Sequence, residues 1–252
     1  MNAAEKKVIT RIKEGARTRE EDLIALEKRL RILVNGKDFV RLYCSPIMVR
    51  ELVTGFLLTE GLSGKGFCTE RMSIEYGEEI VVDVPAEEEP SPGPAARTSG
   101  CVGGISFESY ENAPPVTSGL KISFDALKGL FALFQQASNL YRLTGCVHSA
   151  AIADGKRILF QAEDVGRHNA VDKVIGYAVL EAIPLEDKMV LTSGRLSSEI
   201  AGKCARARIP LLASRTAPTT RAIDIAQRAG VTLAGFLRGK SCNVYTHPER
   251  IL

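Results

Sequence analysis

The first third of the chain shows short apolar runs at strand spacing on either side of one stretch at helical spacing. Residues 30–43 (LRILVNGKDFVRLY) contain two apolar runs around Asn35-Gly36, which is the strongest short signal for a β-hairpin. Residues 72–84 (MSIEYGEEIVVDV) predict a second pair of strands that turns at Gly77. The pattern therefore predicts two antiparallel strand pairs.

The stretch between these strand pairs predicts one helix. In residues 45–61 (SPIMVRELVTGFLLTEG), apolar residues recur near helical spacing. Ser45 is predicted as the N-cap, Pro46 as the first helical residue and Gly61 as the residue that ends the helix. We therefore expect a small α+β lobe over residues 25–84, preceded by a charged N-terminal extension over residues 1–24.

Residues 85–117 lose this regular pattern and are dominated by Pro, Glu, Gly and Ala. We expect a flexible loop here, and it carries Cys101 close to Gly100, Gly103 and Gly104. Cysteine is among the most buried residue types, so a thiol between glycines in such a loop is expected to be unusually exposed to solvent. A nucleophilic thiol that visits two partners and an incidental linker cysteine both fit the pattern. Zinc fits poorly, because no second cysteine or histidine stands at ligand spacing.

Residues 123–145 predict one long helix that is capped by Ser123 and ends at Gly145. The apolar stripe of this helix is expected to pack into the core and comprises Leu127, Leu130, Phe131, Phe134, Ala137 and Tyr141.

From residue 149 onward, strand and helix patterns alternate. Residues 149–161 predict a hairpin at Asp154-Gly155, and strands are predicted at 188–193, 209–214, 231–238 and 242–246. Helices are predicted between them at 169–182, 197–208 and 219–230. Alternation of this kind indicates a mostly parallel sheet that is covered on both faces. We therefore expect a three-layer α/β/α lobe over residues 118–252.

The composition is that of an ordinary globular protein. The chain has 252 residues, 45% of them hydrophobic and 25% charged, and its formal net charge of +3 is too small to argue for nucleic acid. No apolar run approaches the roughly 18 residues that span a bilayer. The charged start lacks the apolar region of a signal peptide, so the expected compartment is the cytoplasm. The six cysteines are irregularly spaced, which argues against a disulfide framework.

Chemistry is expected where the strands of the sheet end, because open α/β sheets bind ligands outside the carboxyl ends of their strands. Residues 144–150 (TGCVHSA) place Cys146 and His148 two apart, on one face of an extended segment. The thiol and the imidazole either cooperate, or they are a small buried cysteine beside a hydrogen-bonded histidine.

Residues 163–173 (EDVGRHNAVDK) concentrate polar groups at the start of a helix. Gly166 permits a tight turn, Arg167 offers donors to an anion, and His168 can move a proton near neutral pH. A solvated charged loop is the alternative.

Three further stretches at the ends of predicted strands add cationic groups. Ser193, Gly194 and Arg195 resemble a phosphate cradle at a helix start, although a routine capped helix has the same features. Ser214-Arg215 and residues 236–241 (FLRGKS) follow two other strands. Four arginines at the carboxyl ends of strands of one sheet indicate a multiply anionic ligand, such as a nucleotide or a pyrophosphate-bearing cofactor: Arg167, Arg195, Arg215 and Arg238.

These stretches together resemble the formate dehydrogenase accessory sulfurtransferase family (FdhD, also called NarQ). The resemblance rests on EDVGRHNAVDKVIG (163–176), LTSGRLSSEI (191–200) and GFLRGKSCNVYTHPERIL (235–252). VNG (34–36), GFLLTEG (55–61) and TGCVHSAAI (144–152) fit the same pattern, so the match runs from about residue 25 to the C-terminus.

The resemblance implies a function and partners. Family members carry persulfide sulfur from a cysteine desulfurase to the molybdenum bis(molybdopterin guanine dinucleotide) cofactor, which then activates formate dehydrogenase. They are cytoplasmic, act as dimers and bind the cofactor through its guanine nucleotide portions, so free guanine nucleotides are expected at the same site. No nucleic acid or membrane partner is expected.

The resemblance also implies a cytidine-deaminase-like larger lobe without the deaminase zinc. His148-Ser149-Ala150 does not match the H-x-E motif of those enzymes, and no P-C-x-x-C follows it.

The family pattern assigns roles to residues. Cys101 matches the first cysteine of the family's C-x-x-C, which takes the persulfide, whereas Gly104 replaces the second. The cofactor-binding stretch matches Phe236, Leu237, Arg238, Gly239, Lys240 and Ser241. We expect His168 and Asp164 to position groups and transfer protons. The other expected cofactor-binding residues are His148, Gly166, Arg167, Asn169, Ser193, Gly194, Arg195, Ser214 and Arg215. Gly104 favours one rival function, a nucleotide-binding chaperone that shelters and inserts the cofactor without a covalent sulfur step.

Overall fold

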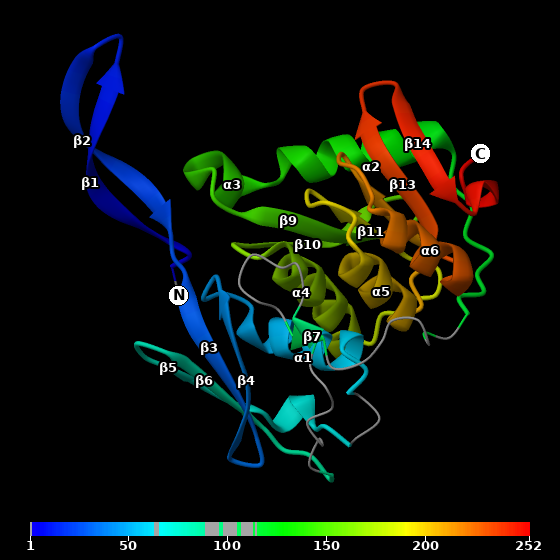
Figure 1. The fold of residues 1–252 in the computed structure, drawn as a ribbon, viewed down its shortest axis with the longest axis horizontal. Helices are drawn as coiled ribbons and strands as arrows, with labels where there is room; N and C mark the ends of the chain where they lie inside the picture. Colours follow the sequence, from blue (N-terminus) through cyan, green and yellow to red (C-terminus); the bar gives the residue numbers. More distant parts are fainter. Residues whose placement is uncertain (1, 63–65, 89–95, 98–104, 107–112, 114) are drawn as a thin grey trace.

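The structure is a computed structural model of the 252-residue chain, and it describes residues 2–62, 66–88, 96–97, 105–106, 113 and 115–252. It places a small four-stranded sheet beside a larger six-stranded sheet, with helices between and around them (Figure 1). Cys101 and Gly104 lie outside the described residues, as does most of the predicted loop 85–117.

The small sheet contains both predicted strand pairs, in the order β4-β3-β6-β5. β3 (Lys28–Val34) and β4 (Lys37–Cys44) form the hairpin at Asn35-Gly36, where both residues have the positive φ that this tight turn requires. β5 (Ser73–Tyr76) and β6 (Ile80–Val84) form the second antiparallel pair, and β3 and β6 are parallel. Both predicted pairs are confirmed.

Helix α1 (Val49–Thr59) begins later than its sequence signals indicate. Its N-cap is Met48, in the left-handed conformation, so the predictions of Ser45 as N-cap and Pro46 as first helical residue are wrong. The Ser45 hydroxyl instead accepts a hydrogen bond from the backbone N–H of Val165 in the larger lobe, at 3.2 Å. The Ser45 side chain therefore makes a tertiary hydrogen bond instead of capping the helix. Gly61 has φ +74°, and its predicted role at the end of the helix is confirmed.

The N-terminal residues form an exposed β-hairpin that projects from the body of the molecule (Figure 1). β1 (Ala4–Lys13) and β2 (Ala16–Ala25) pair along their whole length and turn at Glu14-Gly15. No strand is predicted here because charged residues interrupt the apolar alternation. Two shorter pieces, β7 (Ala96–Arg97) and β8 (Ile105–Ser106), also pair antiparallel, and η2 (Thr69–Arg71) is a single 3-10 turn.

The six-stranded sheet has the order β10-β9-β11-β12-β13-β14. Its strands are β9 (His148–Ala153), β10 (Ile158–Asp164), β11 (Met189–Thr192), β12 (Leu211–Ser214), β13 (Thr232–Arg238) and β14 (Ser241–Thr246). Only β11–β12 and β12–β13 are parallel pairs, so the expectation of a mostly parallel sheet is wrong. Tight hairpins join β9 to β10 and β13 to β14, and a hairpin makes its strands antiparallel.

Helices cover both faces of this sheet, which confirms the three-layer α/β/α arrangement. Side chains of α2 (Phe124–Gln136) pack on one face. On the other face pack α4 (Arg167–Leu180), α5 (Ser198–Arg206) and α6 (Thr220–Ala229). A last 3-10 turn, η4 (Pro248–Arg250), lies near the C-terminus.

The single long helix predicted over 123–145 is two helices. Ser123 caps α2 as expected, but α2 ends at Gln136, and α3 (Asn139–Thr144) follows as a separate short helix. Gln161 of β10 donates to the Phe134 carbonyl and to the Ser138 hydroxyl at this break, each at 3.2 Å. The buried stripe therefore stops at Phe134, and Tyr141 is 51% exposed.

Helix α1 packs against α4 with almost no space between the two backbones. A Cβ added at Gly55 of α1 would lie 2.7 Å from the Asp172 carbonyl carbon and closer still to its oxygen. A Cβ at Gly176 of α4 would collide in the same way with the Glu51 carbonyl. The other side of α1 forms the core of the small lobe with β3, β4 and β6, so this helix joins the two lobes.

We expect Gly55→Ala to lower the free energy of unfolding by about 3 kcal/mol or more, because the methyl group forces α1 and α4 apart. Gly129→Ala is the matched control, since Gly129 lies in α2 with open space around its Cβ position. That variant should be stabilised by about 0.5–1 kcal/mol through helix propensity. Urea unfolding of both variants measures the difference. Equal stability of the two would show that the glycine contact is unimportant.

Candidate functional site

The loops that follow the parallel strands meet at one edge of the large sheet. Leu196, after β11, donates its backbone N–H to the Ala217 carbonyl at 3.2 Å and accepts from Thr219 at 3.0 Å. The hydroxyls of Ser214 and Thr216 both donate to the Gly194 carbonyl at 2.7 Å. These bonds hold the loops after β11 and β12 side by side.

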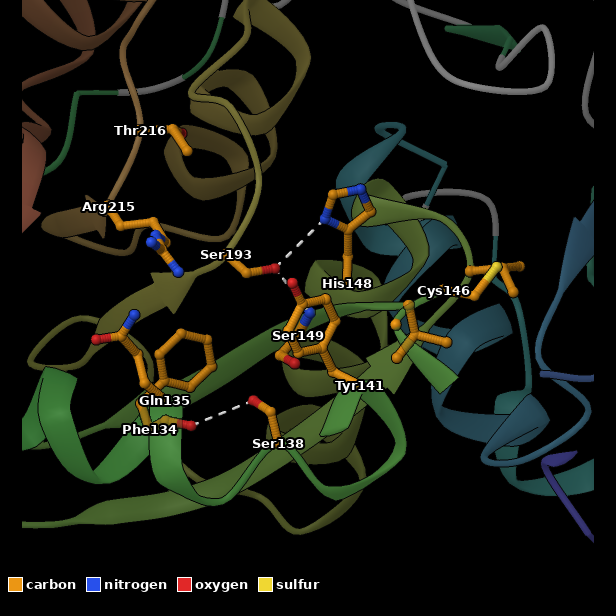
Figure 2. Close-up of a pocket in the computed structure, with 13 residues that line it drawn as sticks. Phe134, Gln135, Ser138, Tyr141, Cys146, His148, Ser149, Ser193, Arg215 and Thr216 are labelled. Atoms are coloured by element: carbon orange, nitrogen blue, oxygen red, sulfur yellow. Dashed lines mark hydrogen bonds between the residues drawn. The ribbon is translucent and has the colours of Figure 1, made fainter. Parts of the chain in front are cut away.

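A pocket of about 430 Å³ opens at this edge (Figure 2). Its size falls within the roughly 300–1,000 Å³ typical of small-molecule sites. It is lined by residues of α2, α3, β9 and the strand-to-helix loops: Phe134, Gln135, Ser138, Tyr141, Gly145, Cys146, Val147, His148, Ser149, Val165, Ser193, Arg215 and Thr216. The predicted site residues His148, Ser193 and Arg215 are thus brought together. Tyr141 reaches the pocket because it is not part of the core.

His148 and Ser193 form the polar centre of the pocket. His148 Nδ1 lies 3.3 Å from Ser193 Oγ, and that same hydroxyl oxygen accepts the Ser149 backbone N–H at 2.9 Å. Burial lowers the pKa of His148, and the charges of Arg167 and Arg195 and the neighbouring His168 lower it further, whereas Asp164 acts in the opposite direction. The surroundings of His148 therefore favour the neutral form of its imidazole.

Asp164 lies beneath this site and is fully buried. Its carboxylate pairs with Lys173 at 2.6 Å, and both side chains are 0% exposed. It also accepts the backbone N–H groups of Gly166, at 2.8 Å, and of Ser45, at 3.1 Å. The geometry suits a positioning role, because Asp164 fixes the turn that begins α4.

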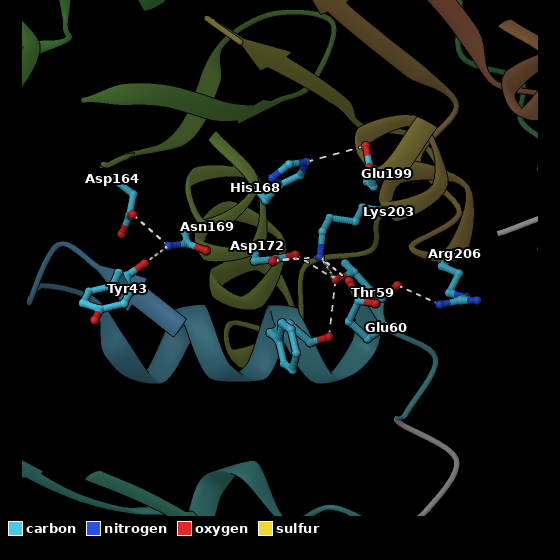
Figure 3. A network of polar contacts seen from close by, with 11 residues as sticks. Tyr43, Thr59, Glu60, Asp164, His168, Asn169, Asp172, Glu199, Lys203 and Arg206 are labelled. Carbon is cyan, nitrogen blue, oxygen red and sulfur yellow. Dashed lines mark hydrogen bonds and ion pairs between the residues drawn. The ribbon is translucent and has the colours of Figure 1, made fainter. Parts of the chain in front are cut away.

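Asn169 also stabilises the turn that begins α4. Its side-chain amide donates to Asp164 at 2.9 Å and to the Tyr43 carbonyl of the small lobe at 2.8 Å (Figure 3). An added Cβ at Gly166 would lie 2.9 Å from that same amide nitrogen. Gly166 therefore allows the close turn that Asn169 and Asp164 stabilise.

Arg167 and His168 stand between this turn and helix α5. The Arg167 side chain packs against Gly194, where a Cβ would lie 3.0 Å from Arg167 Cβ. His168 Nε2 lies 3.9 Å from Glu199 Oε2, and both side chains are largely buried. Sequence reasoning missed Glu199, although an acidic residue in the first turn of a helix at this edge was the available signal.

The stretch 236–241 forms the outer rim of the edge. Phe236 has φ +50° at a bulge in β13 and is 39% exposed. Arg238 donates from Nε to the Arg215 carbonyl at 2.8 Å, and its guanidinium carbon lies 5.6 Å from the centre of the Phe236 ring. Arg195, Gly239, Lys240 and Ser241 are exposed, whereas Leu237 and Ser214 are buried in the fold.

A second buried cluster joins the lobes behind the site, and the sequence did not reveal it. Lys203 of α5 pairs with Asp172 of α4 at 2.9 Å and with Glu60, just after α1, at 2.8 Å (Figure 3). Thr59 donates to Asp172 at 2.7 Å. Burial raises the pKa of Asp172, even though Lys203 lies beside it.

Two negative observations concern only the part of the chain that the structure describes. Within it, no three His, Cys, Asp or Glu side chains gather as they would around a metal ion. Within the same residues, no helix has the length and apolar character needed to cross a bilayer.

The fold and this edge define a three-layer α/β/α protein with an arginine-flanked pocket at the ends of its parallel strands. The chain belongs to the FdhD/NarQ family, whose sequence model matches residues 25–252. It is 37% identical over 253 residues to the sulfur carrier protein FdhD of Bacillus pumilus, covering 98% of this chain and 97% of that one. It is also 37% identical over 250 residues to the sulfur carrier protein FdhD of Bacillus subtilis, covering 96% and 95%.

A solved structure supports the fold. A proposed formate dehydrogenase accessory protein from Desulfotalea psychrophila superimposes with a TM-score of 0.81 and 28% identity, over the whole length of both chains. The family resemblance predicted from the sequence motifs is confirmed.

We expect the pKa of His148, followed by NMR of its ring carbons, to lie below its ordinary value of 6.5. The unfolded chain then binds more protons than the folded one between the two pKa values, so stability rises with pH in that window. His148→Gln should lose this part of the pH dependence. A pKa at or above 6.5 would contradict the burial of a neutral imidazole.

Proposed function

We propose that this protein is a sulfur carrier in the maturation of formate dehydrogenase. Its membership of the FdhD/NarQ family over residues 25–252 carries the proposal. Relatives that are 37% identical over nearly their whole length are named sulfur carrier proteins, and the structural neighbour is a proposed formate dehydrogenase accessory protein.

The substrate that receives the sulfur is the molybdenum bis(molybdopterin guanine dinucleotide) cofactor. Its pyrophosphate and guanine groups suit the arginine-flanked edge of the large sheet. Arg215 lines the pocket, Arg238 bonds to the backbone of Arg215, and the charges of Arg167 and Arg195 act on His148. Helices α4, α5 and α6 all begin at this edge, where helix N-termini favour phosphate groups. Free guanine nucleotides should bind at the same place.

The sulfur step begins at Cys101. Its thiolate attacks the terminal sulfur of the cysteine desulfurase persulfide, a new S–S bond forms on Cys101, and the desulfurase cysteine leaves as a thiolate. His168 is the candidate for proton transfer at the site, and Asp164 positions the turn that carries it. The protein acts in the cytoplasm as a homodimer, with formate dehydrogenase as the client.

A chaperone that binds the cofactor without carrying sulfur is the rival function. The observation in its favour is Gly104, which stands where the family pattern has a second cysteine. The two functions differ in whether Cys101 acquires sulfur, because a chaperone needs no thiol chemistry.

Incubation with a cysteine desulfurase and cysteine should add the mass of one sulfur atom to the peptide that contains Cys101. Cys101→Ala should lose this transfer, because the attacking thiolate is gone, while the control Cys68→Ala keeps it. Peptide mass spectrometry measures both. Equal sulfur uptake by wild type and Cys101→Ala would contradict the assignment.

Guanosine diphosphate should bind about 10-fold or more weakly to Arg215→Ala than to wild type, because a charge-assisted hydrogen bond is worth about 1.5–3 kcal/mol. Arg228→Ala is the control, since Arg228 lies exposed in the last turn of α6, far from the helix start at this edge. Calorimetric titration gives both affinities. If the two variants bind equally well, the nucleotide site lies elsewhere.

A further inference from the structure

The short helix α3 lines the pocket through Tyr141, yet it has no face packed in the core. None of its six residues, Asn139–Thr144, is buried, and Tyr141 is 51% exposed. Helices this short are unstable in water unless tertiary contacts hold them. The position of α3, and with it the place of the Tyr141 ring among the lining residues (Figure 2), therefore depends largely on polar contacts.

Glu163 of β10 supplies the cap that α3 does not make for itself. The first backbone N–H groups of a helix have no partner within the helix, and a side chain at the N-cap normally accepts one of them. The N-cap residue of α3, Ser138, makes no such bond, and its hydroxyl donates to the Phe134 carbonyl at 3.3 Å. The two carboxylate oxygens of Glu163 instead accept the N–H groups of Leu140 and Tyr141, each at 2.9 Å. The helix start is thus bonded directly to the large sheet.

The same carboxylate also connects α3 to the polar centre of the pocket. Glu163 lies opposite Ser149 in the β9–β10 pairing, and its Oε1 accepts the Ser149 hydroxyl at 3.4 Å. The Ser149 backbone N–H donates to Ser193 Oγ at 2.9 Å, and that oxygen lies 3.3 Å from His148 Nδ1. One side chain therefore fixes Tyr141 relative to His148 and Ser193.

We propose that Glu163 is a positioning residue for nucleotide binding, which holds Tyr141 as the surface on which the guanine base stacks. This inference rests on the proposed function, in which guanine nucleotides bind at this edge of the sheet. A flat heterocycle stacks readily on a tyrosine ring. Arg215 lines the same pocket, where its charge suits the phosphate groups. Glu163 acts through Tyr141 and not on the nucleotide, because both of its oxygens are bonded to α3.

Calorimetric titration of the full chain with guanosine diphosphate and with inorganic pyrophosphate separates the contribution of the base from that of the phosphates. Tyr141→Ala should bind guanosine diphosphate about 10-fold more weakly than wild type, because the stacking surface is lost, and Tyr141→Phe should bind it normally. Glu163→Ala should show the same loss, whereas pyrophosphate should bind both alanine variants as it binds wild type. The double variant should bind no more weakly than either single variant, because both changes remove the same contact.

Asp154→Ala is the matched control for Glu163→Ala. The Asp154 carboxylate also accepts two backbone N–H groups, from Lys156 at 2.7 Å and Arg157 at 2.8 Å, but it lies in the β9–β10 turn and does not line the pocket. This variant loses a similar pair of hydrogen bonds, so it should bind guanosine diphosphate as tightly as wild type. Glu163→Gln keeps an acceptor oxygen and should recover part of the affinity. Tyr141 is exposed, so its variants test the stacking surface even if Glu163→Ala does not fold.

The outcomes separate this inference from the proposed function. Unchanged guanosine diphosphate affinity in Glu163→Ala or in Tyr141→Ala would overturn the inference and leave the carrier function standing. An equal loss in Asp154→Ala, or an equal loss of pyrophosphate affinity, would also overturn it, since either result shows a general structural effect. Additive losses in the double variant would show that Glu163 does not act through Tyr141. Wild-type protein that binds neither ligand would instead overturn the nucleotide site of the proposed function.

Discussion

Helices α1 and α4 touch backbone to backbone at Gly55 and Gly176, and the arrangement of the two lobes depends on this contact. Any side chain at either position would push the helices apart. Because α1 is also the core helix of the small sheet, the contact fixes that sheet against the large one. It also sets the spacing across which the buried ion pairs form.

Two buried ionic clusters also join elements of the two lobes. Lys173 reaches Asp164 on β10 and the Ser45 carbonyl after β4, while Lys203 reaches Glu60 after α1 and Asp172 on α4. Buried charges are costly unless each is paired and hydrogen-bonded, so such clusters hold their elements in one arrangement. The first cluster also fixes the turn at 164–169, and the position of the site therefore depends on the interface between the lobes.

The site divides its work between buried and exposed groups. The side chains of Asp164, Asn169 and Ser214 form hydrogen bonds within the chain and hold the backbone in place. His148, Ser193 and Arg215 instead line the pocket. Sequence motifs cannot separate these two kinds of residue, because both are polar and both stand at strand ends.

The sequence by itself determined most of the local elements, the three-layer fold and the family, but not the N-terminal hairpin β1–β2. Alternating apolar runs, the Asn35-Gly36 turn and the Ser123 cap act over a few residues, so they can be read from the chain. Only the tertiary structure decided the mixed strand directions and the break between α2 and α3. It also decided that the Ser45 hydroxyl accepts a hydrogen bond from Val165 of the other lobe. It also decided that Gly55 meets Gly176 and that Lys203 meets Glu60. These contacts join residues more than 100 positions apart, and no local pattern encodes their distance.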